Sequence, residues 1–432
     1  MVERFLAKEE VAGSSPVSRS SFSFVPQLLE GFILFMKKIG KVLLKSSAEK
    51  KIRNFYLWIY KDEIEKVVID DDEGLVDVLS PKGEFICVGY YSKYSRNPIK
   101  VFSYSKKVDV DFEVSKRILM ALEERFRMAK SGLVNPNSFR VVFSESDFLP
   151  GLVIDKYGDY VGFQIRNRFF ESLRDYIIEA IDKLLSPIGI YERSDIDYRM
   201  QEENLSPRNV PAKGKVPDVI NIVEWDTTRF LFPTFSGQKT GFFLDQSFNR
   251  KIISELVSAE TKVLDMFSYV GGFGIFLAKK GANVVCVEKS LEYSDFIKEN
   301  AEANGVTNKV RVITGDAFSV IDSIQEKFDL IILDPPTFVK SLSESRKRLP
   351  MLIDLIKKSF QLLNDNGKLV VFSCSYNLLK EHLIAAIRIA CMELGIRVKV
   401  ERELMQSPDH PWALQMPETL YLKGFVLSKL PY

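Results

Sequence analysis

The chain of 432 residues has only four cysteines and two histidines. Cys87, Cys286, Cys374 and Cys391 lie far apart and form no Cys-x-x-Cys pair, so we expect neither a disulfide framework nor a metal site. No apolar run approaches the ~20 residues that span a bilayer, so membrane insertion is not expected either. Hydrophobic residues make up 46% of the chain and charged residues 27%, which together with the length predicts a globular protein of two or three domains.

The first 36 residues do not fit this pattern. The stretch FVPQLLEGFILFM (24–36) is as apolar as a signal-peptide core, but its leader is not basic, a glutamate interrupts it and no small-residue cleavage site follows. The preceding Gly-Ser-Ser-Pro is a product expected from translation through the T-arm of a tRNA gene. We therefore expect residues 1–36 to be a non-native or disordered extension, Met36 to be the native start, and the protein to be cytoplasmic.

Residues 37–107 are basic, with 15 Lys and Arg against 10 Asp and Glu. Cations and aromatics alternate there, which suits phosphate contact and base stacking, although a solvated helix beside core aromatics explains them as well. Short alternating runs such as KVVID and EFICVGYY predict a small β-barrel. The segment resembles a PUA RNA-binding domain. The cations and aromatics concerned are Lys37, Lys38, Lys41, Lys45, Lys50, Lys51, Arg53, Phe55, Tyr56, Trp58 and Tyr60.

Residues 108–214 read as a central α+β domain. The stretch DFEVSKRILMALEERFRMA has helical periodicity, and RVVFSESDFLPGLVIDKYGDYVGFQIR predicts strands joined by Leu-Pro-Gly and Tyr-Gly-Asp turns. No motif in this region indicates a catalytic or ligand-binding site. The stretch PRNVPAKGKVP (207–217), rich in proline, glycine and lysine, is the best candidate for a linker to the next domain.

Residues 215–432 alternate strands with amphipathic helices, which predicts a doubly wound parallel sheet. The first strand ends at Asp265, and Glu288 ends the second strand, where a carboxylate can hold two ribose hydroxyls. The phosphate-binding pattern Gly-x-Gly-x-x-Gly is missing, so S-adenosylmethionine, which has no pyrophosphate, is the expected cofactor. The residues expected to contact it are Asp265 at the strand end and, in the loop that follows, Phe267, Ser268, Tyr269, Gly271 and Gly272.

Two further strand ends carry polar residues. Asp316, in RVITGDAF, is placed to recognise an adenine amino group, and FDLIILDPPTF ends a strand at Asp334. Pro335 and Pro336 then form a stiff rim, followed by Phe338, that can press on a flat substrate. Asp-Pro-Pro alone is a common tight turn, but in register with the other strand ends it favours a class I methyltransferase.

Cys374 follows the next predicted strand, KLVVF, and so reaches the same carboxyl edge. The other three cysteines interrupt strands or a helix and are best interpreted as small core residues. A thiolate at this edge can add to C6 of a pyrimidine and make C5 nucleophilic enough to accept a methyl group. A buried, inert thiol is the alternative, and the flanking serines argue against it.

From residue 37 to 432 the chain resembles the PUA-domain-containing methyltransferases that form 5-methylcytosine in large-subunit ribosomal RNA. SDFLPGLVIDKYG, QKTGFFLDQ, FSYVGGF, LDPPTF, FSCS and DHPWALQMPETLYLKGF carry the resemblance. It implies a PUA, a central and a seven-stranded Rossmann-like domain in that order, S-adenosylmethionine as methyl donor, and Cys374 as nucleophile. No second cysteine lies near Asp334, so another group must take the C5 proton.

Three more residues are candidates for the site. Asp245 and Gln246, at a predicted helix start, could meet the methionine end of the cofactor, although Asp245 could equally be an N-cap. The missing base could be Asp334, which is also expected to contact the cofactor, or His410 in a loop, although an ordinary loop histidine is the commoner case.

The predicted function is cytosine-C5 methylation of large-subunit ribosomal RNA. Methylation of an exocyclic amine needs no thiol and remains an alternative, and uracil would use the same thiol chemistry. A non-catalytic ribosome-assembly factor that binds RNA and S-adenosylmethionine is the alternative from another class. We expect no membrane partner.

Overall fold

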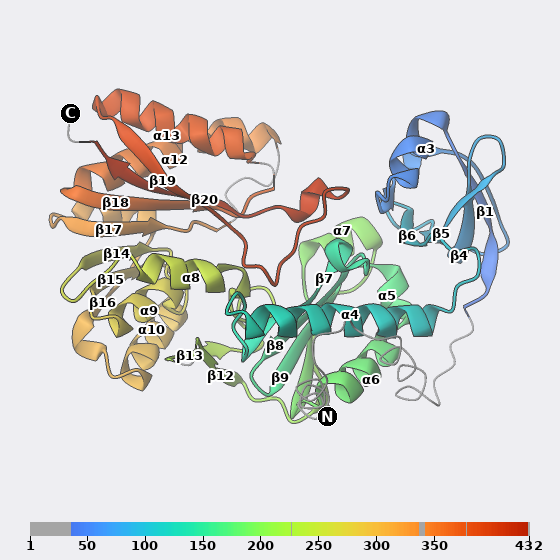
Figure 1. Ribbon diagram of the computed structural model, residues 1–432, viewed down its shortest axis with the longest axis horizontal. Helices are drawn as coiled ribbons and strands as arrows, with labels where there is room; N and C mark the ends of the chain where they lie inside the picture. The colour runs from blue at the N-terminus through green and yellow to red at the C-terminus, as the bar shows by residue number, and fades with distance from the viewer. Residues whose placement is uncertain (1–35, 226, 337–341, 377, 431–432) are drawn as a thin grey trace.

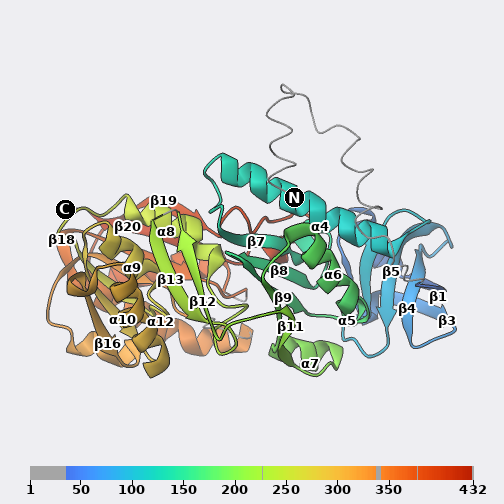
Figure 2. The ribbon, with the colours of Figure 1, turned by 90° about the horizontal axis from the view of Figure 1, so that it is seen from below.

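The structure is a computed structural model that describes residues 36–225, 227–336, 342–376 and 378–430. The expectation about the leader, apart from Met36, and the assignment of Phe338 lie outside these residues. The N-terminal domain, the central domain and the C-terminal α/β domain lie in a row (Figures 1 and 2). Within the described ranges, no helix combines the length and apolarity needed to cross a bilayer.

The N-terminal domain is one six-stranded sheet of order β2-β6-β5-β4-β1-β3. The side chains of Tyr56 and Trp58 bind residues of the other domains. The Tyr56 hydroxyl donates to Glu418 at 2.8 Å, and Trp58 Nε1 donates to Glu145 at 3.1 Å. These contacts favour the structural over the RNA-stacking interpretation of the two rings. The elements are β1 (Lys38–Leu44), α3 (Ser46–Arg53), β2 (Trp58–Ile59), β3 (Ile64–Ile69), β4 (Glu73–Leu79), β5 (Phe85–Ser92) and β6 (Ile99–Ser103).

The central domain is a five-stranded sheet of order β11-β10-β9-β8-β7, with the long helix α4 running along it (Figure 2). Residues 207–217 were expected to be a linker, which is wrong, because they contain the edge strand β11, paired with β10. An edge strand tolerates proline, whose missing N–H can face outward. The elements are α4 (Val110–Lys130), β7 (Ser138–Phe143), β8 (Leu152–Tyr157), β9 (Tyr160–Ile165), α5 (Arg168–Ser172), α6 (Arg174–Leu185), β10 (Gly189–Ser194), α7 (Asp197–Glu203) and β11 (Arg208–Gly214).

A hairpin of β12 (Val219–Glu224) and β13 (Thr228–Pro233) precedes the C-terminal sheet, whose order is β16-β15-β14-β17-β18-β20-β19. The predicted seven-stranded Rossmann-like sheet is therefore confirmed, with β20 antiparallel to β18. The strands are β14 (Lys262–Met266), β15 (Asn283–Glu288), β16 (Val310–Thr314), β17 (Phe328–Leu333), β18 (Leu363–Ser373), β19 (Val398–Met405) and β20 (Lys423–Lys429). The helices are α8 (Ser247–Ser254), α9 (Gly272–Lys279), α10 (Leu291–Ala303), α11 (Ala317–Val320), α12 (Leu342–Leu362) and α13 (Lys380–Leu394).

Hydrophobic cores cross the domain boundaries. Tyr157 and Tyr191 of the central sheet pack in the same core as the hairpin and one face of the C-terminal sheet. Met416, in the β19–β20 connection (residues 406–422), packs into the core of the N-terminal domain, and Figure 1 shows this red segment reaching toward it. The domains therefore hold one another in place around the carboxyl edge of the C-terminal sheet.

Candidate active site

A cavity of about 570 Å³ opens at the carboxyl ends of β14, β15, β17 and β18. Most of the predicted site residues line it, together with residues of the segment 238–250 that precedes β14. The predicted residues in its wall are Asp245, Gln246, Phe267, Ser268, Tyr269, Gly272, Glu288, Asp316, Asp334, Pro335, Pro336 and Cys374.

The loop after β14 has an unusual backbone. Phe267 (φ 66°) and Tyr269 (φ 53°) both occupy the left-handed region, where a residue other than glycine costs about 1–3 kcal/mol. Gly271 (φ 86°) follows as the N-cap of α9, a conformation that a side chain disfavours. Strain concentrated in one loop indicates a backbone shaped to meet a ligand.

Glu288, at the end of β15, holds this loop with its carboxylate. Oε2 accepts the N–H of Tyr269 at 2.8 Å, and Oε1 accepts the N–H of Ser290 at 2.9 Å. A carboxylate has about four acceptor positions, so acceptor capacity remains for hydroxyls in the cavity. Burial raises the pKa of Glu288.

Asp265 was expected to contact the cofactor, but it does not line the cavity. It is 1% exposed, and its Oδ2 accepts the N–H of Gly274 at 2.9 Å, beneath the start of α9. Burial raises the pKa of Asp265 to about 7. This carboxylate anchors the helix that shapes the loop, and Gly271 likewise lies behind the cavity wall.

The β16 end contributes a polar group and a flat apolar surface. Asp316 accepts the N–H of Phe318 at 3.1 Å and forms an ion pair with Lys289 at 3.1 Å. Phe318 packs edge-on against Phe267, with ring centroids 5.5 Å apart, and both rings line the cavity. A planar base fits beside these rings.

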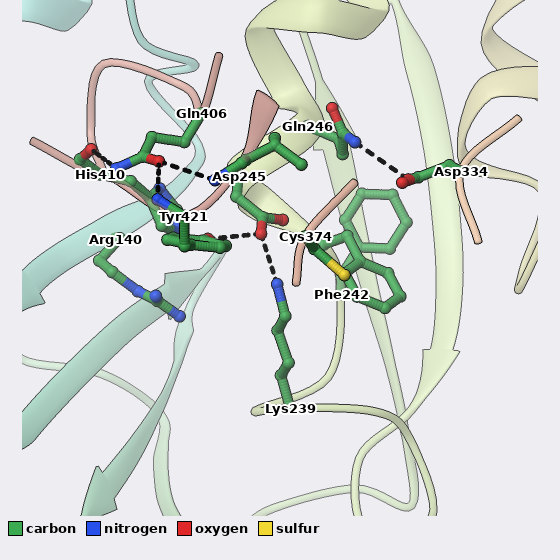
Figure 3. A network of polar contacts seen from close by, with 12 residues as sticks. Arg140, Lys239, Phe242, Asp245, Gln246, Asp334, Cys374, Gln406, His410 and Tyr421 are labelled. Atoms are coloured by element: carbon green, nitrogen blue, oxygen red, sulfur yellow. Dashed lines mark hydrogen bonds and ion pairs between the residues drawn. The ribbon is translucent and has the colours of Figure 1, made fainter. Parts of the chain in front are cut away.

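Asp334 and Cys374 approach the cavity from the ends of the adjacent strands β17 and β18. Gln246 Nε2 donates to Asp334 Oδ2 at 3.0 Å (Figure 3). Burial, followed by the negative charge of Asp245, raises the pKa of Asp334 to about 7. The Cys374 thiol lies 3.9 Å from the carbonyl oxygen of Pro335, which accepts its weak hydrogen bond. Cys374 is partly exposed, whereas the other three cysteines are buried.

The sequence did not single out Lys239, although QKTGFFLDQ contains it. Lys239 forms an ion pair with Asp245, and the Tyr421 hydroxyl donates to the same carboxylate at 2.5 Å (Figure 3). Burial alone would raise the pKa of Asp245, but Lys239 and His410 favour the charged carboxylate more strongly and hold the pKa of Asp245 below its usual value. The N-cap alternative for Asp245 is wrong, because α8 begins at Ser247 with Gln246 as its N-cap.

The central domain fixes the segment that carries Lys239. Arg140 binds Asp155 through two hydrogen bonds of 2.7 Å, and Asp155 accepts the Thr240 hydroxyl. The Tyr157 hydroxyl donates to the carbonyl of Phe242 at 3.0 Å. The motif SDFLPGLVIDKYG therefore positions the cavity wall.

His410 lies outside the cavity wall. It is 2% exposed, and its Nδ1 lies 3.0 Å from Asp409 Oδ1. Asp409 in turn accepts the backbone N–H of Arg140 at 2.8 Å. The structure thus places His410 in the packing between the β19–β20 connection and the central domain.

The cavity fits a ligand that has a ribose, a planar base and a charged end. Glu288 suits the ribose hydroxyls, the rings of Phe267 and Phe318 suit the base, and Gln246 and Lys239 offer an amide and a cation in the same wall for the charged end. In the described part of the chain, no cluster of three or more His, Cys, Asp or Glu could hold a metal. Fold and site together define an S-adenosylmethionine-dependent methyltransferase domain.

Comparisons with known proteins agree with this assignment to the methyltransferases. Residues 42–104 match the PUA-like domain family, and residues 238–349 match the TRM5/TYW2 methyltransferase domain family. Ribosomal RNA large subunit methyltransferase I of Aeromonas salmonicida is 35% identical over 396 residues, covering 89% of this chain and 98% of the relative. The protein of the same name from Escherichia coli is 31% identical over 394 residues, with coverages of 89% and 98%. The chain belongs to the ribosomal RNA large subunit methyltransferase I family.

Solved structures show the same fold. A protein described as an S-adenosylmethionine-dependent methyltransferase of Streptococcus mutans has a TM-score of 0.75 at 23% identity, covering 90% of this chain and 100% of its own. A methyltransferase solved in complex with S-adenosylhomocysteine has a TM-score of 0.77 at 22% identity, with the same coverages. The predicted PUA-like domain and methyltransferase fold are thereby confirmed.

Proposed function

We propose that this protein binds S-adenosylmethionine and methylates C5 of a cytosine in large-subunit ribosomal RNA through a covalent adduct of Cys374. The names of its relatives support the class of RNA substrate. The observation that carries the mechanism is the position of Cys374, whose thiol shares one cavity with the expected cofactor residues.

The chemistry explains why a thiol is needed. C5 of cytosine is a poor nucleophile, and addition of the Cys374 thiolate to C6 moves electron density onto C5. Bound S-adenosylmethionine supplies an electrophilic methyl group. After C5 has accepted the methyl group, removal of the C5 proton restores the C5–C6 double bond and expels the thiolate.

Asp334 is the better candidate for the proton acceptor. It ends the strand next to that of Cys374, and a carboxylate whose pKa is about 7 can take up and release a proton near neutral pH. His410 has no comparable position, since it does not line the cavity. Pro335 and Pro336, in the cavity wall, suit contact with a flat base that has left its stack.

Trapping tests the adduct. In the presence of S-adenosylmethionine, RNA carrying 5-fluorocytosine should form a bond with the wild-type protein that survives denaturing electrophoresis, because after methyl transfer C5 carries fluorine in place of the proton that must leave. Cys374→Ala should form none, and Asp334→Asn should accumulate a methylated adduct on unmodified RNA. Methyl transfer by Cys374→Ala would indicate amine methylation instead, and binding of cofactor and RNA without any transfer would indicate an assembly factor.

A further inference from the structure

Lys423 lies where the strand that carries the thiol ends. It is the first residue of β20 and pairs with Ser373, the last residue of β18. Cys374 follows Ser373 directly, so Lys423 and the thiol occupy the same edge of the sheet.

The ammonium group of Lys423 is held beside the residue that follows the thiol. Its Nζ donates to the carbonyl oxygen of Ser375 at 2.6 Å, so the side chain reaches from β20 across to the segment that carries Cys374. Lys423 is partly buried, and no carboxylate among the described residues lies within ion-pair distance of it. An ammonium group removed from water without a counter-ion is unfavourable, so this position calls for a nearby negative charge.

Electrostatics points to the thiolate as that charge. Burial lowers the pKa of Lys423 to about 8, and the negative charge of Cys374, followed by that of Glu381 on α13, opposes this shift. The interaction is mutual, so a thiolate that stabilises the ammonium group is itself stabilised by it.

Among the described residues, the other charged groups at this edge of the sheet do not serve this purpose. Asp334, Glu381 and the Tyr421 hydroxyl are acidic groups, and a negative charge on any of them disfavours a thiolate. The cations of the cavity wall are paired with carboxylates: Lys239 with Asp245, Arg250 with Glu224 and Lys289 with Asp316.

We propose that Lys423 is a positioning residue for the thiol, and that its ammonium group is the counter-ion that keeps Cys374 ionised for attack on the pyrimidine. The inference rests on the proposed role of Cys374 as nucleophile. It concerns the ionisation of the thiol, which can be measured without RNA or cofactor.

The test is the pH profile of alkylation of Cys374 by iodoacetamide in the full chain, followed by mass spectrometry of the tryptic peptide 369–380. Lys423→Met should move the midpoint of this profile up by about one pH unit and slow alkylation at pH 7 about three- to tenfold. Lys423→Arg should stay within about twofold of wild type, because it keeps the charge. Lys429→Met is the matched control, since Lys429 closes the same strand and its Nζ also donates to a carbonyl, that of Leu363.

Circular dichroism of each variant checks folding, and Lys423→Gln is the substitute if Lys423→Met does not fold. An unchanged profile in either folded neutral variant overturns the inference. A shifted profile together with full methylation by Cys374→Ala supports the counter-ion role and contradicts the proposed nucleophile.

Discussion

Replacing Glu288 with alanine should weaken cofactor binding and also destabilise the ligand-free protein. A hydrogen bond to a charged group contributes about 1.5–3 kcal/mol, so losing the hydrogen bonds to both ribose hydroxyls should cost about 3–6 kcal/mol of binding free energy. That corresponds to an increase in Kd of roughly 150- to 20,000-fold.

The second effect follows from the backbone contacts of Glu288. The alanine variant leaves the N–H groups of Tyr269 and Ser290 without their acceptor, which should lower the free energy of unfolding by about 1–2 kcal/mol. Glu288→Gln keeps one acceptor oxygen and should give intermediate values. Glu292, an exposed acid four residues along whose carboxylate accepts the Ser236 hydroxyl, offers the matched control Glu292→Ala.

Isothermal titration with S-adenosylmethionine and with S-adenosylhomocysteine measures the Kd, and urea denaturation without ligand measures the unfolding free energy. Titrations belong at a temperature at which circular dichroism shows each variant folded. A folded Glu288→Ala protein that binds the cofactor with the wild-type Kd would refute the assignment of this carboxylate to the ribose.

Three other predictions concern residues away from the ribose site. Arg140→Ala leaves Asp155 buried without its cation and should lower the free energy of unfolding in urea by about 3–5 kcal/mol. The double variant Arg140→Met, Asp155→Leu should recover part of that stability, and an equal loss of stability in the single and double variants would contradict the reasoning. Burial raises the pKa of Asp265 in the folded state to about 7, so its contribution to stability is present below about pH 4 and is lost as the pH rises to about 7. Asp265→Asn should therefore reduce the loss of stability between about pH 4 and pH 7, and an unchanged loss would exclude Asp265 as its source. Replacing the exposed residues Lys41, Lys45 and Lys50 with glutamine should reduce the slope of log affinity for RNA against log salt concentration by about one for each phosphate that these lysines neutralise. An unchanged slope would show that these lysines do not contact RNA phosphates.

The carboxyl edge of the C-terminal sheet could be predicted because it follows from local patterns. Parallel strands end at one edge, so polar residues that follow apolar runs, such as Glu288, Asp334 and Cys374, converge there. The position of a residue at a strand end did not reveal which way its side chain points. Asp265 also ends a strand, but its carboxylate accepts a backbone N–H of α9 and faces away from the cavity.

Contacts between distant segments could not be predicted from one sequence. Tyr421 and Asp245 are 176 positions apart in the sequence, and Tyr56 and Glu418 are 362 positions apart, so no local periodicity or spacing predicts either hydrogen bond. The role of Asp155 was hidden for the same reason, since its partner Thr240 belongs to the next domain. A residue type and a strand end predict where chemistry can occur, whereas the supporting contacts depend on how the domains pack.

The most direct test of the central claim is nucleoside mass spectrometry of large-subunit ribosomal RNA incubated with purified protein and S-adenosylmethionine. The protein should introduce 5-methylcytidine, and Cys374→Ala should introduce none while binding the cofactor with unchanged Kd. A methylated adenosine or guanosine in place of 5-methylcytidine, or the same yield of 5-methylcytidine from Cys374→Ala, would contradict the account.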